Sequence, residues 1–255
     1  MKNKTQKNEL NCPKYIYKYK SLRSEEDLQR LIDIIDLNRI YTPHYYELND
    51  PLEGQAVEIE IPGYAGISIY YNADKEDMVI QEIKKEYGIL CFSDLANSSQ
   101  LWTHYAGGYS GVCLCFSSKG AFSEIKPVKY VKKQKKLSIR KGEVASSMDR
   151  LVKESFYLKM QNWSYEREFR LVVERGNEGY YYFDPTALKG IILGHKVPEK
   201  KIEAVFSHLS PDIKRFKTDI GYRTCQINIL NYDYKYEYDG SELRRVDLEK
   251  ELSSS

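Results

Sequence analysis

The chain has 255 residues, 42% of them hydrophobic and 13% aromatic, which is the composition of a folded protein with a substantial core rather than of a disordered chain. Lys and Arg number 39 against 37 Asp and Glu, so the near-neutral balance excludes a polyelectrolyte that would bind nucleic acid over its whole surface. The 23 tyrosines favour strands and half-buried aromatic surfaces, and therefore a β-rich fold.

The five cysteines show no Cys-x-x-Cys spacing and the four histidines are scattered, so the sequence predicts no metal site from these residues. Free buried thiols are typical of a reducing compartment. Residues 1–11 are polar and lysine-rich with no apolar stretch behind them, and no later run reaches transmembrane length. We therefore expect a cytoplasmic protein without a membrane segment.

The first half of the chain alternates strands and helices. Ser24, followed by Asp27, predicts the start of a helix with an approximate capping box and a buried stripe. Apolar alternation or buried runs predict strands at 16–19, 39–42, 57–61, 88–93 and 111–116. Two further helices are expected, over 74–87 and, with Ser98 or Ser99 as the cap, up to Ala106.

The second half begins with a basic segment, 126–141, followed by a predicted helix over 143–161. Strands are expected at 169–174, 179–183, 190–193 and from 224 onward, with one helix over 199–208. Neither repeats nor a linker divide the chain. We predict one α+β domain over residues 15–250, between a flexible N-terminus (1–14) and a frayed tail (251–255).

Residues 163–170, Trp-Ser-Tyr-Glu-Arg-Glu-Phe-Arg, form the segment with the strongest chemical character. If Glu168 opens a strand, alternation places Glu166, Glu168 and Arg170 on one face. Two carboxylates near a core are unfavourable unless a cation or ligand compensates them, so the segment is a candidate active-site edge. The alternative is a strand end whose charges form local ion pairs.

Two other motifs admit both a structural and a functional interpretation. Asn49 and Asp50 precede Pro51 and can form a simple turn, or stand with Glu53 at the rim of a cleft. Trp102 and Tyr105 share one face of a short helix and are either core residues or the wall of a site for a flat ligand.

The basic segment is a candidate nucleic-acid surface, because clustered cations beside an aromatic residue bind phosphates and stack on bases. A solvated loop is the alternative. The lysines that we assign to this surface are Lys129, Lys132, Lys133, Lys135 and Lys136.

Several motifs together resemble those of a bacterial family known as a domain of unknown function. The resemblance covers residues 15–195 and rests on a Tyr-x-Tyr start, an Asn-Asp-Pro-x-Glu loop, a Trp-x-x-Tyr-Ala segment before a Gly-Val-x-Leu strand, and a Tyr-Glu-x-Glu-x-Arg element. Here these motifs begin at Tyr17, Asn49, Trp102, Gly111 and Tyr165. This resemblance by itself implies no reaction.

The order of elements also remotely resembles that of ADP-ribosyltransferases, which implies a β-rich split core with peripheral helices and NAD as the substrate. The resemblance implies that Glu168 stabilises the positive charge developing on the ribose, that Glu166 orients or deprotonates the acceptor, and that Arg170 keeps both carboxylates ionised. The residues then expected to bind NAD are Tyr17, Lys18, Tyr19, Asn49, Asp50, Ser93, Trp102 and Tyr105. Lys18 stands where those enzymes usually have Arg or His.

The acceptor expected first is RNA or DNA, because of the basic segment, and a protein acceptor is the second choice. By analogy the protein would be a toxin or phage-defence effector, with an antitoxin protein as a partner. Two other classes remain open. One is a non-catalytic module that binds nucleic acid or a protein partner. The other is a nuclease in which Asp50, Glu53, Glu166 and Glu168 hold a divalent metal.

Overall fold

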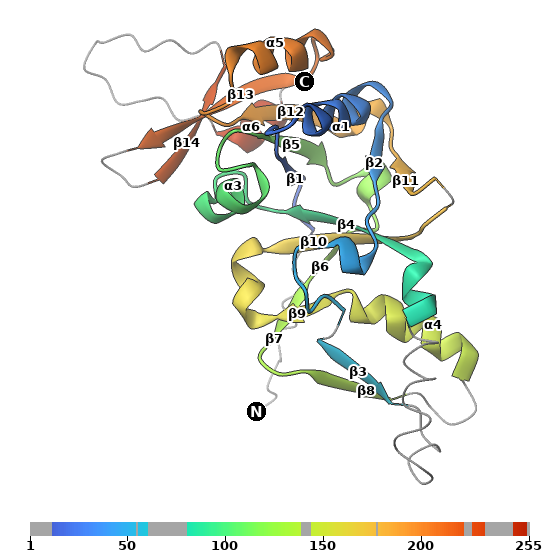
Figure 1. Ribbon diagram of the computed structural model, residues 1–255. Helices are drawn as coiled ribbons and strands as arrows, with labels where there is room; N and C mark the ends of the chain where they lie inside the picture. The colour runs from blue at the N-terminus through green and yellow to red at the C-terminus, as the bar shows by residue number, and fades with distance from the viewer. Residues whose placement is uncertain are drawn as a thin grey trace, which may run out of the picture.

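A mixed eight-stranded sheet organises the computed structural model, with helices on both of its faces (Figure 1). The structure describes residues 12–54, 56–60, 81–138, 144–176, 178–221, 226–232 and 247–253. The strand order is β14-β13-β12-β5-β1-β4-β10-β6, and β12 and β13 are the parallel pair in it. Its strands are β1 (Tyr15–Lys20), β4 (Tyr87–Ser93), β5 (Val112–Ser117), β6 (Lys126–Pro127), β10 (Glu168–Glu174), β12 (Leu188–Leu193), β13 (Lys214–Gly221) and β14 (Gln226–Asn231).

The sheet opens between two of its central strands. β1 pairs with β5 along its whole length, from Tyr15 opposite Ser117 to Lys20 opposite Val112. On its other side β1 meets β4 at one position, Tyr17 opposite Ser93. Since paired strands lie only about 4.8 Å apart, a lost ladder leaves room for side chains between them. This opening positions the candidate site.

Apolar residues cover the two faces of the sheet in separate clusters. Helix α1 (Glu25–Asp36) and helix α5 (Glu199–Ser207) pack on one face, where Leu31 and Val205 are fully buried. The predicted capping box of α1 is confirmed, with Ser24 and Asp27 exchanging hydrogen bonds. On the other face, Trp102 of helix α3 (Ser99–Tyr105) belongs to the second cluster.

Smaller elements extend the fold beyond the main sheet. They comprise α4 (Val144–Ser155) and three two-stranded pairs: β2 (Arg39–Tyr41) with β11 (Tyr180–Tyr182), β3 (Val57–Glu60) with β8 (Lys135–Ser138), and β7 (Lys129–Val131) with β9 (Leu158–Met160). Figure 1 shows β3, β8 and α4 at the opposite end of the molecule from α5. Short 3-10 turns are η1 (Tyr45–Glu47), η2 (Gly120–Phe122), η3 (Gln161–Glu166) and η4 (Pro185–Ala187).

The α+β prediction is confirmed, but several element boundaries differ from those expected. The helix predicted over 143–161 ends at Ser155, because Leu158–Met160 turn into a strand beside β7. Strand β13 was not predicted. The flexible N-terminus falls mostly outside the described residues, as does the first half of the helix expected over 74–87, of which residues 81–85 are helical. No helix in the described ranges is long and apolar enough to span a membrane.

The end of the chain differs most from expectation. Residues 251–253, expected to fray, belong to helix α6 (Leu248–Ser253), and Leu252 is only 1% exposed within the second apolar cluster. Glycine at position 190 leaves space for this side chain, because a Cβ there would lie 3.0 Å from Leu252 Cδ2. Leu252 therefore packs helix α6 against the sheet, whereas the sequence predicted only a short polar tail here.

Replacing Leu252 with Ala should lower the free energy of unfolding by about 2–5 kcal/mol, the usual effect of emptying a buried leucine site. Urea denaturation followed by circular dichroism would measure it. The matched control is Lys250→Ala, an exposed position on the same helix, which should change stability by less than about 0.5 kcal/mol. Equal effects of the two substitutions would show that α6 is not docked.

Candidate functional site

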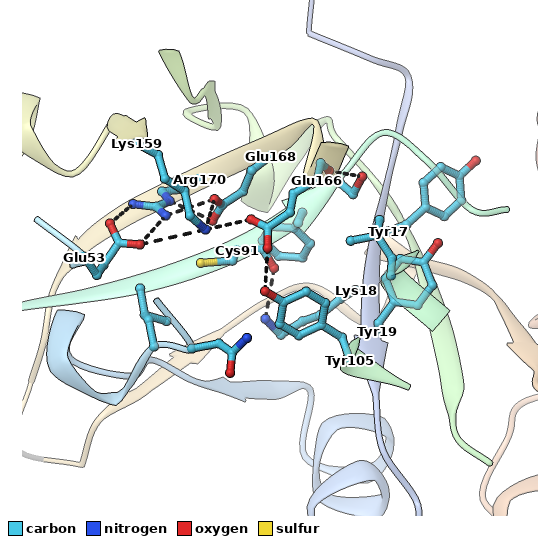
Figure 2. A pocket seen from close by; sticks show the side chains of 15 residues that line it. Tyr17, Lys18, Tyr19, Glu53, Cys91, Tyr105, Lys159, Glu166, Glu168 and Arg170 are labelled. Atoms are coloured by element: carbon cyan, nitrogen blue, oxygen red, sulfur yellow. Dashed lines mark hydrogen bonds and ion pairs between the residues drawn. The ribbon is translucent and has the colours of Figure 1, made fainter. Parts of the chain in front are cut away.

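A pocket of about 190 Å³ lies at the opening between β1 and β4 (Figure 2). Residues from both of these strands line it, together with the 48–53 loop, α3, β9, the end of η3 and β10. Nine residues predicted from the sequence are among those that line it: Tyr17, Lys18, Tyr19, Asn49, Ser93, Tyr105, Glu166, Glu168 and Arg170. The structure thus brings together side chains that are up to 153 positions apart in the sequence.

Arg170 is the most deeply buried charge of the site, with no exposed surface. Its Nη1 and Nη2 donate to the two oxygens of Glu53, at 2.6 and 2.8 Å. Its Nε and Nη2 donate to the two oxygens of Glu168, at 2.7 and 2.9 Å, and Nη1 also donates to the Phe156 carbonyl at 2.6 Å. All five N–H groups of the guanidinium therefore have acceptors, which a buried arginine requires.

Lys159 supplies the second cation of this network. Its Nζ donates to Glu166 Oε2 at 2.6 Å and to Glu168 Oε2 at 3.2 Å, and lies 4.0 Å from Glu53 Oε2. It also lies 4.8 Å from the centre of the Trp163 ring. We call Glu53, Lys159, Glu166, Glu168 and Arg170 the charged cluster. It contains three carboxylates and two cations, all of them nearly inaccessible to solvent.

A left-handed turn separates the two neighbouring glutamates. Strand β10, expected over 169–174, begins one residue earlier at Glu168, and Glu166 ends the 3-10 helix η3 instead of extending the strand. Arg167 between them has φ 46° and ψ 53°, a conformation uncommon for residues other than glycine, and its exposed guanidinium pairs with Asp94. Glu166 and Glu168 therefore both line the pocket, but not through the strand alternation expected from the sequence. The left-handed turn at Arg167 brings Glu166 there.

Hydrogen bonds from the surrounding elements hold both glutamates in place. The Tyr105 hydroxyl donates to Glu166 Oε1, and Ser93 Oγ donates to the Glu166 backbone carbonyl at 2.7 Å. The Glu168 amide donates to the hydroxyl of Tyr130 at 2.8 Å. Figure 2 shows Glu166 directed towards Tyr105, whereas Glu168 is directed towards Arg170 and Lys159.

The two glutamates differ in proton affinity. Burial by itself would raise the pKa of the Glu168 carboxyl, but Arg170 and then Lys159 outweigh it and lower the pKa from 4.5 to about 2. Burial raises the pKa of Glu166 above 4.5, and Lys159 offsets only part of that rise. One carboxylate is therefore permanently ionised while its neighbour can exchange a proton, which is the arrangement of many acid–base sites.

Lys18 brings a third ammonium group to the pocket. Its Nζ donates to the Cys91 carbonyl at 3.1 Å and lies 5.2 Å from the centre of the Phe92 ring. Among the described residues, no carboxylate lies within ion-pair distance of it. Burial lowers its pKa, opposed by Cys91 and Glu168. An anionic group entering the pocket would favour the charged form of Lys18.

Two predicted NAD-binding residues are not among those that line the pocket. Trp102 is fully buried against Tyr19, at 5.3 Å between ring centres, and its Nε1 donates to the Ala96 carbonyl at 2.9 Å. Asp50 is buried and accepts from the Leu52 amide at 2.9 Å, as a turn residue does. The structural interpretation of both motifs therefore agrees with these contacts, while Tyr105 and Asn49 beside them line the pocket.

The predicted nucleic-acid-binding lysines lie apart from the pocket. Lys129 is on β7, Lys132 and Lys133 follow that strand, and Lys135 and Lys136 begin β8, all with exposed side chains. Because Tyr130 reaches Glu168, strand alternation directs Lys129 to the opposite side. There a separate groove also contains Lys126, Arg150 and Lys153, together with the acidic residues Asp149 and Glu154.

Lys159 is the functional residue that sequence analysis missed, because the segment was assigned to a helix. The available signal was the alternation of Leu158, Lys159 and Met160, which is typical of a short strand with one charged face. Glu53 was considered only for a cleft rim and for metal binding. Its partner, Arg170, lies 117 positions away, a distance that no local pattern spans.

Replacing Arg170 with Met should lower the free energy of unfolding by about 3–5 kcal/mol, because Glu53 and Glu168 would remain buried without their main partner. Arg170→Lys should also destabilise, since an ammonium cannot serve the same five acceptors. Thermal and urea unfolding would measure both. The control is Arg167→Met, whose exposed ion pair should contribute less than about 1 kcal/mol. A similar result at both positions would contradict a structural role for the buried network.

The contribution of Glu168 to the free energy of unfolding should depend on pH. Its folded-state pKa of about 2 lies below the 4.5 of the free side chain, so its stabilising effect is full above about pH 4.5 and is lost as the pH falls through about 2. This shift corresponds to stabilisation on the order of 3 kcal/mol. In urea titrations, the stability difference between wild type and Glu168→Gln should shrink across that pH window. A difference independent of pH would show that Glu168 is not held ionised.

The middle of the chain is similar to a known protein family. A family model described as a protein of unknown function (DUF2971) matches residues 101–171, from α3 into β10. No curated protein and no solved structure gives a significant match. The matched segment includes Tyr105, Lys159, Glu166, Glu168 and Arg170, whereas Glu53 and β1 lie outside it. The chain is thus similar to a family of unknown function over the segment that supplies most of the charged cluster.

Proposed function

We propose that the protein is an ADP-ribosyltransferase that uses NAD to modify a macromolecule, with a nucleic acid as the first acceptor to test. The supporting observation is that the charged cluster has three carboxylates and two cations and that Glu166 lines the pocket, where the pKa of the further cation, Lys18, is lowered by burial. Breaking the bond between nicotinamide and ribose creates positive charge on the ribose. A preorganised negative group stabilises that transition state more than the ground state.

In the proposed reaction, the bond between ribose C1′ and the nicotinamide nitrogen breaks, and its electron pair leaves with the nicotinamide. A nucleophilic atom of the acceptor then forms a bond to C1′ and loses its proton. Glu166 is the residue to which we assign both the stabilisation of the developing charge and the acceptance of that proton. Its raised pKa supports this role, because a general base is most effective when its pKa approaches the working pH.

We assign Glu168 a positioning role instead of the direct contact with ribose suggested by the resemblance. Both of its oxygens already accept hydrogen bonds from Arg170, and one of them also accepts from Lys159. A substrate hydroxyl would have to compete with charge-assisted bonds at both oxygens of Glu168, whereas, among the described residues, Oε1 of Glu166 accepts only from the neutral hydroxyl of Tyr105. Arg170 fixes the carboxylate of Glu168, which accepts from Lys159, and Lys159 in turn orients the carboxylate of Glu166.

The pocket volume of about 190 Å³ is below the roughly 300–1,000 Å³ of a site for a complete drug-sized ligand. In this proposal it therefore receives the nicotinamide, its ribose and an oxygen of the adjoining phosphate, but not the adenylate part. Tyr105 would contact the nicotinamide, with Tyr17 and Tyr19 on the β1 side. Lys18 would bind a phosphate oxygen, and the support for this role is an ammonium that donates to a single carbonyl.

A metal-dependent nuclease has less support. The carboxylates of Glu53, Glu166 and Glu168 do converge, but the ammonium of Lys159 lies at the point of convergence, 2.6–4.0 Å from an oxygen of each. Asp50 is not among the residues that line the pocket. A cation would have to displace Lys159 to use these ligands. We therefore assign the site to charge stabilisation by protein groups.

The decisive experiment incubates the folded protein with NAD labelled in the adenylate part, together with RNA, DNA and protein. Glu166→Gln should lower label transfer by about 10²–10³-fold, the usual effect of removing one preorganised stabilising group. The rate of the wild type should fall on acidification as Glu166 takes up a proton, at a pH above that of an ordinary glutamate, and the variant should lack this fall.

Glu203→Gln, an exposed position on α5, is the matched control and should retain full transfer. Circular dichroism would verify that every variant is folded. Absence of transfer to all three polymers, together with absence of nicotinamide release from the folded wild type, would overturn the proposal. Transfer that persists undiminished in Glu166→Gln would reject the role of Glu166 while leaving the activity established.

A further inference from the structure

A second pocket, of about 510 Å³, lies between α1, β2, η1 and β11, beyond the end of β1. Figure 1 shows β2 and β11 side by side next to α1. Its lining includes the cations Lys20, Arg30 and Arg39, the carboxylates Asp33 and Glu47, and the aromatic residues Tyr41 and Tyr180. None of these residues belongs to the charged cluster or lines the first pocket.

The carboxylates of the second pocket already have partners. Asp33 accepts from Gln29 Nε2 at 3.1 Å and from Arg39 Nη2 at 3.2 Å. Glu47 accepts from the Tyr41 hydroxyl at 2.8 Å and from the His44 amide at 2.7 Å. Each of their four oxygens is therefore used. The pocket has more cations than carboxylates, and the carboxylates are not free to neutralise the remaining donors.

Lys20 and Arg39 retain unused donors. In the described part of the chain, the ammonium of half-buried Lys20 makes no hydrogen bond and no ion pair. Arg39 Nε is buried without an acceptor, although buried N–H groups almost always have one. Both side chains line the same pocket. Two cationic donors without acceptors are the complement that an oxyanion such as phosphate requires.

The electrostatic environment of Lys20 supports this interpretation. Burial, followed by the charges of Lys18 and Arg30, lowers the pKa of its ammonium group to about 7, against a smaller opposing effect of Asp27. A charged group in this state is unfavourable without a counter-charge. A bound anion would supply it and would raise the pKa towards its ordinary value.

Aromatic side chains make the second pocket more than a phosphate site. Tyr41 and Tyr180 are opposite each other on β2 and β11, with ring centres 5.9 Å apart in an edge-to-face arrangement. The Arg39 guanidinium lies 4.1 Å from the centre of the Tyr180 ring. Tyr41 is 40% exposed, so its ring can contact a ligand. Bases bind to such combinations of aromatic and guanidinium groups by stacking.

From these contacts we propose that the second pocket is a binding site for a nucleotide, with the phosphate at Lys20 and Arg39 and the base beside Tyr41 and Tyr180. Its volume falls within the roughly 300–1,000 Å³ range of small-molecule sites, which is larger than a phosphate ion alone requires. The site is independent of the proposed transfer reaction, because it shares no residue with the first pocket.

Titration calorimetry of the full-length protein with AMP, and separately with inorganic phosphate, tests this site. Wild type should bind AMP, and Lys20→Met should weaken binding about tenfold or more, the expected effect of losing one charge-assisted hydrogen bond. Tyr180→Leu should weaken AMP binding more than phosphate binding, because it removes the stacking surface for the base while Lys20 remains. Lys200→Met on α5, an exposed charge-matched control, should retain wild-type affinity. Lys20→Met removes an unpaired cation, so it should not lower the melting temperature.

Several outcomes would overturn the proposal. The first is absence of AMP binding by the wild type, and the second is equal affinity for phosphate and AMP. The third is loss of AMP binding in Lys18→Met but not in Lys20→Met, because this result would locate the nucleotide in the first pocket. Glu166→Gln separates the two proposals, because it should keep AMP affinity whether or not it changes label transfer. Failure of the transfer reaction therefore leaves the nucleotide site to be judged by these titrations alone.

Discussion

The burial of the Arg170 guanidinium is the constraint on which the rest of the site depends. A cation without solvent contact is tolerated only when every donor has an acceptor, and Glu53, Glu168 and the Phe156 carbonyl supply all five. These acceptors come from the loop before β3, from β10 and from the chain just after α4. One side chain thereby contacts three segments, between which the described residues form no strand pairing.

The same network gives two nearly adjacent glutamates different chemistry. Glu168 faces Arg170 and is held ionised, whereas Glu166, carried round the left-handed turn at Arg167, faces the pocket and retains a higher proton affinity. Lys159 contacts both carboxylates and so couples their charges. Structural stability and candidate chemistry therefore cannot be separated by removing Arg170, but they can be at Glu166, which is not bonded to Arg170.

Alternate residues of β1 serve different environments. Tyr15 and Tyr17 pack in the apolar cluster with Trp102, while Ile16 packs with the residues of α1. Lys18 and Lys20 are on the parity of Ile16, and each has a pocket next to it. The pocket at Lys18 lies where the ladder to β4 is limited to one position. Lys18 lines the first pocket and Lys20 the second. The strand thus places two ammonium groups, neither of which forms an ion pair with a described residue, at two separate cavities, which is consistent with binding sites for anions.

Local sequence patterns determined much of the secondary structure and many of the site residues. The capping box of α1, the buried strands β4 and β5 and all but the first residue of β10 follow from short-range periodicity and composition. Ser93 and Tyr105, which do line the pocket beside the glutamates, were expected there only from the resemblance to ADP-ribosyltransferases. Tertiary structure alone decided which charges meet. Lys159 lies in β9, which pairs in parallel with β7, a strand distant in the sequence. Glu53 binds Arg170 across 117 positions. Leu252 packs helix α6 against the sheet, although the local sequence is polar and predicted a frayed tail. The physical reason is that periodicity reports only which side of an element is apolar, whereas the partner of a buried charge is selected by the requirement to satisfy every donor in the folded chain.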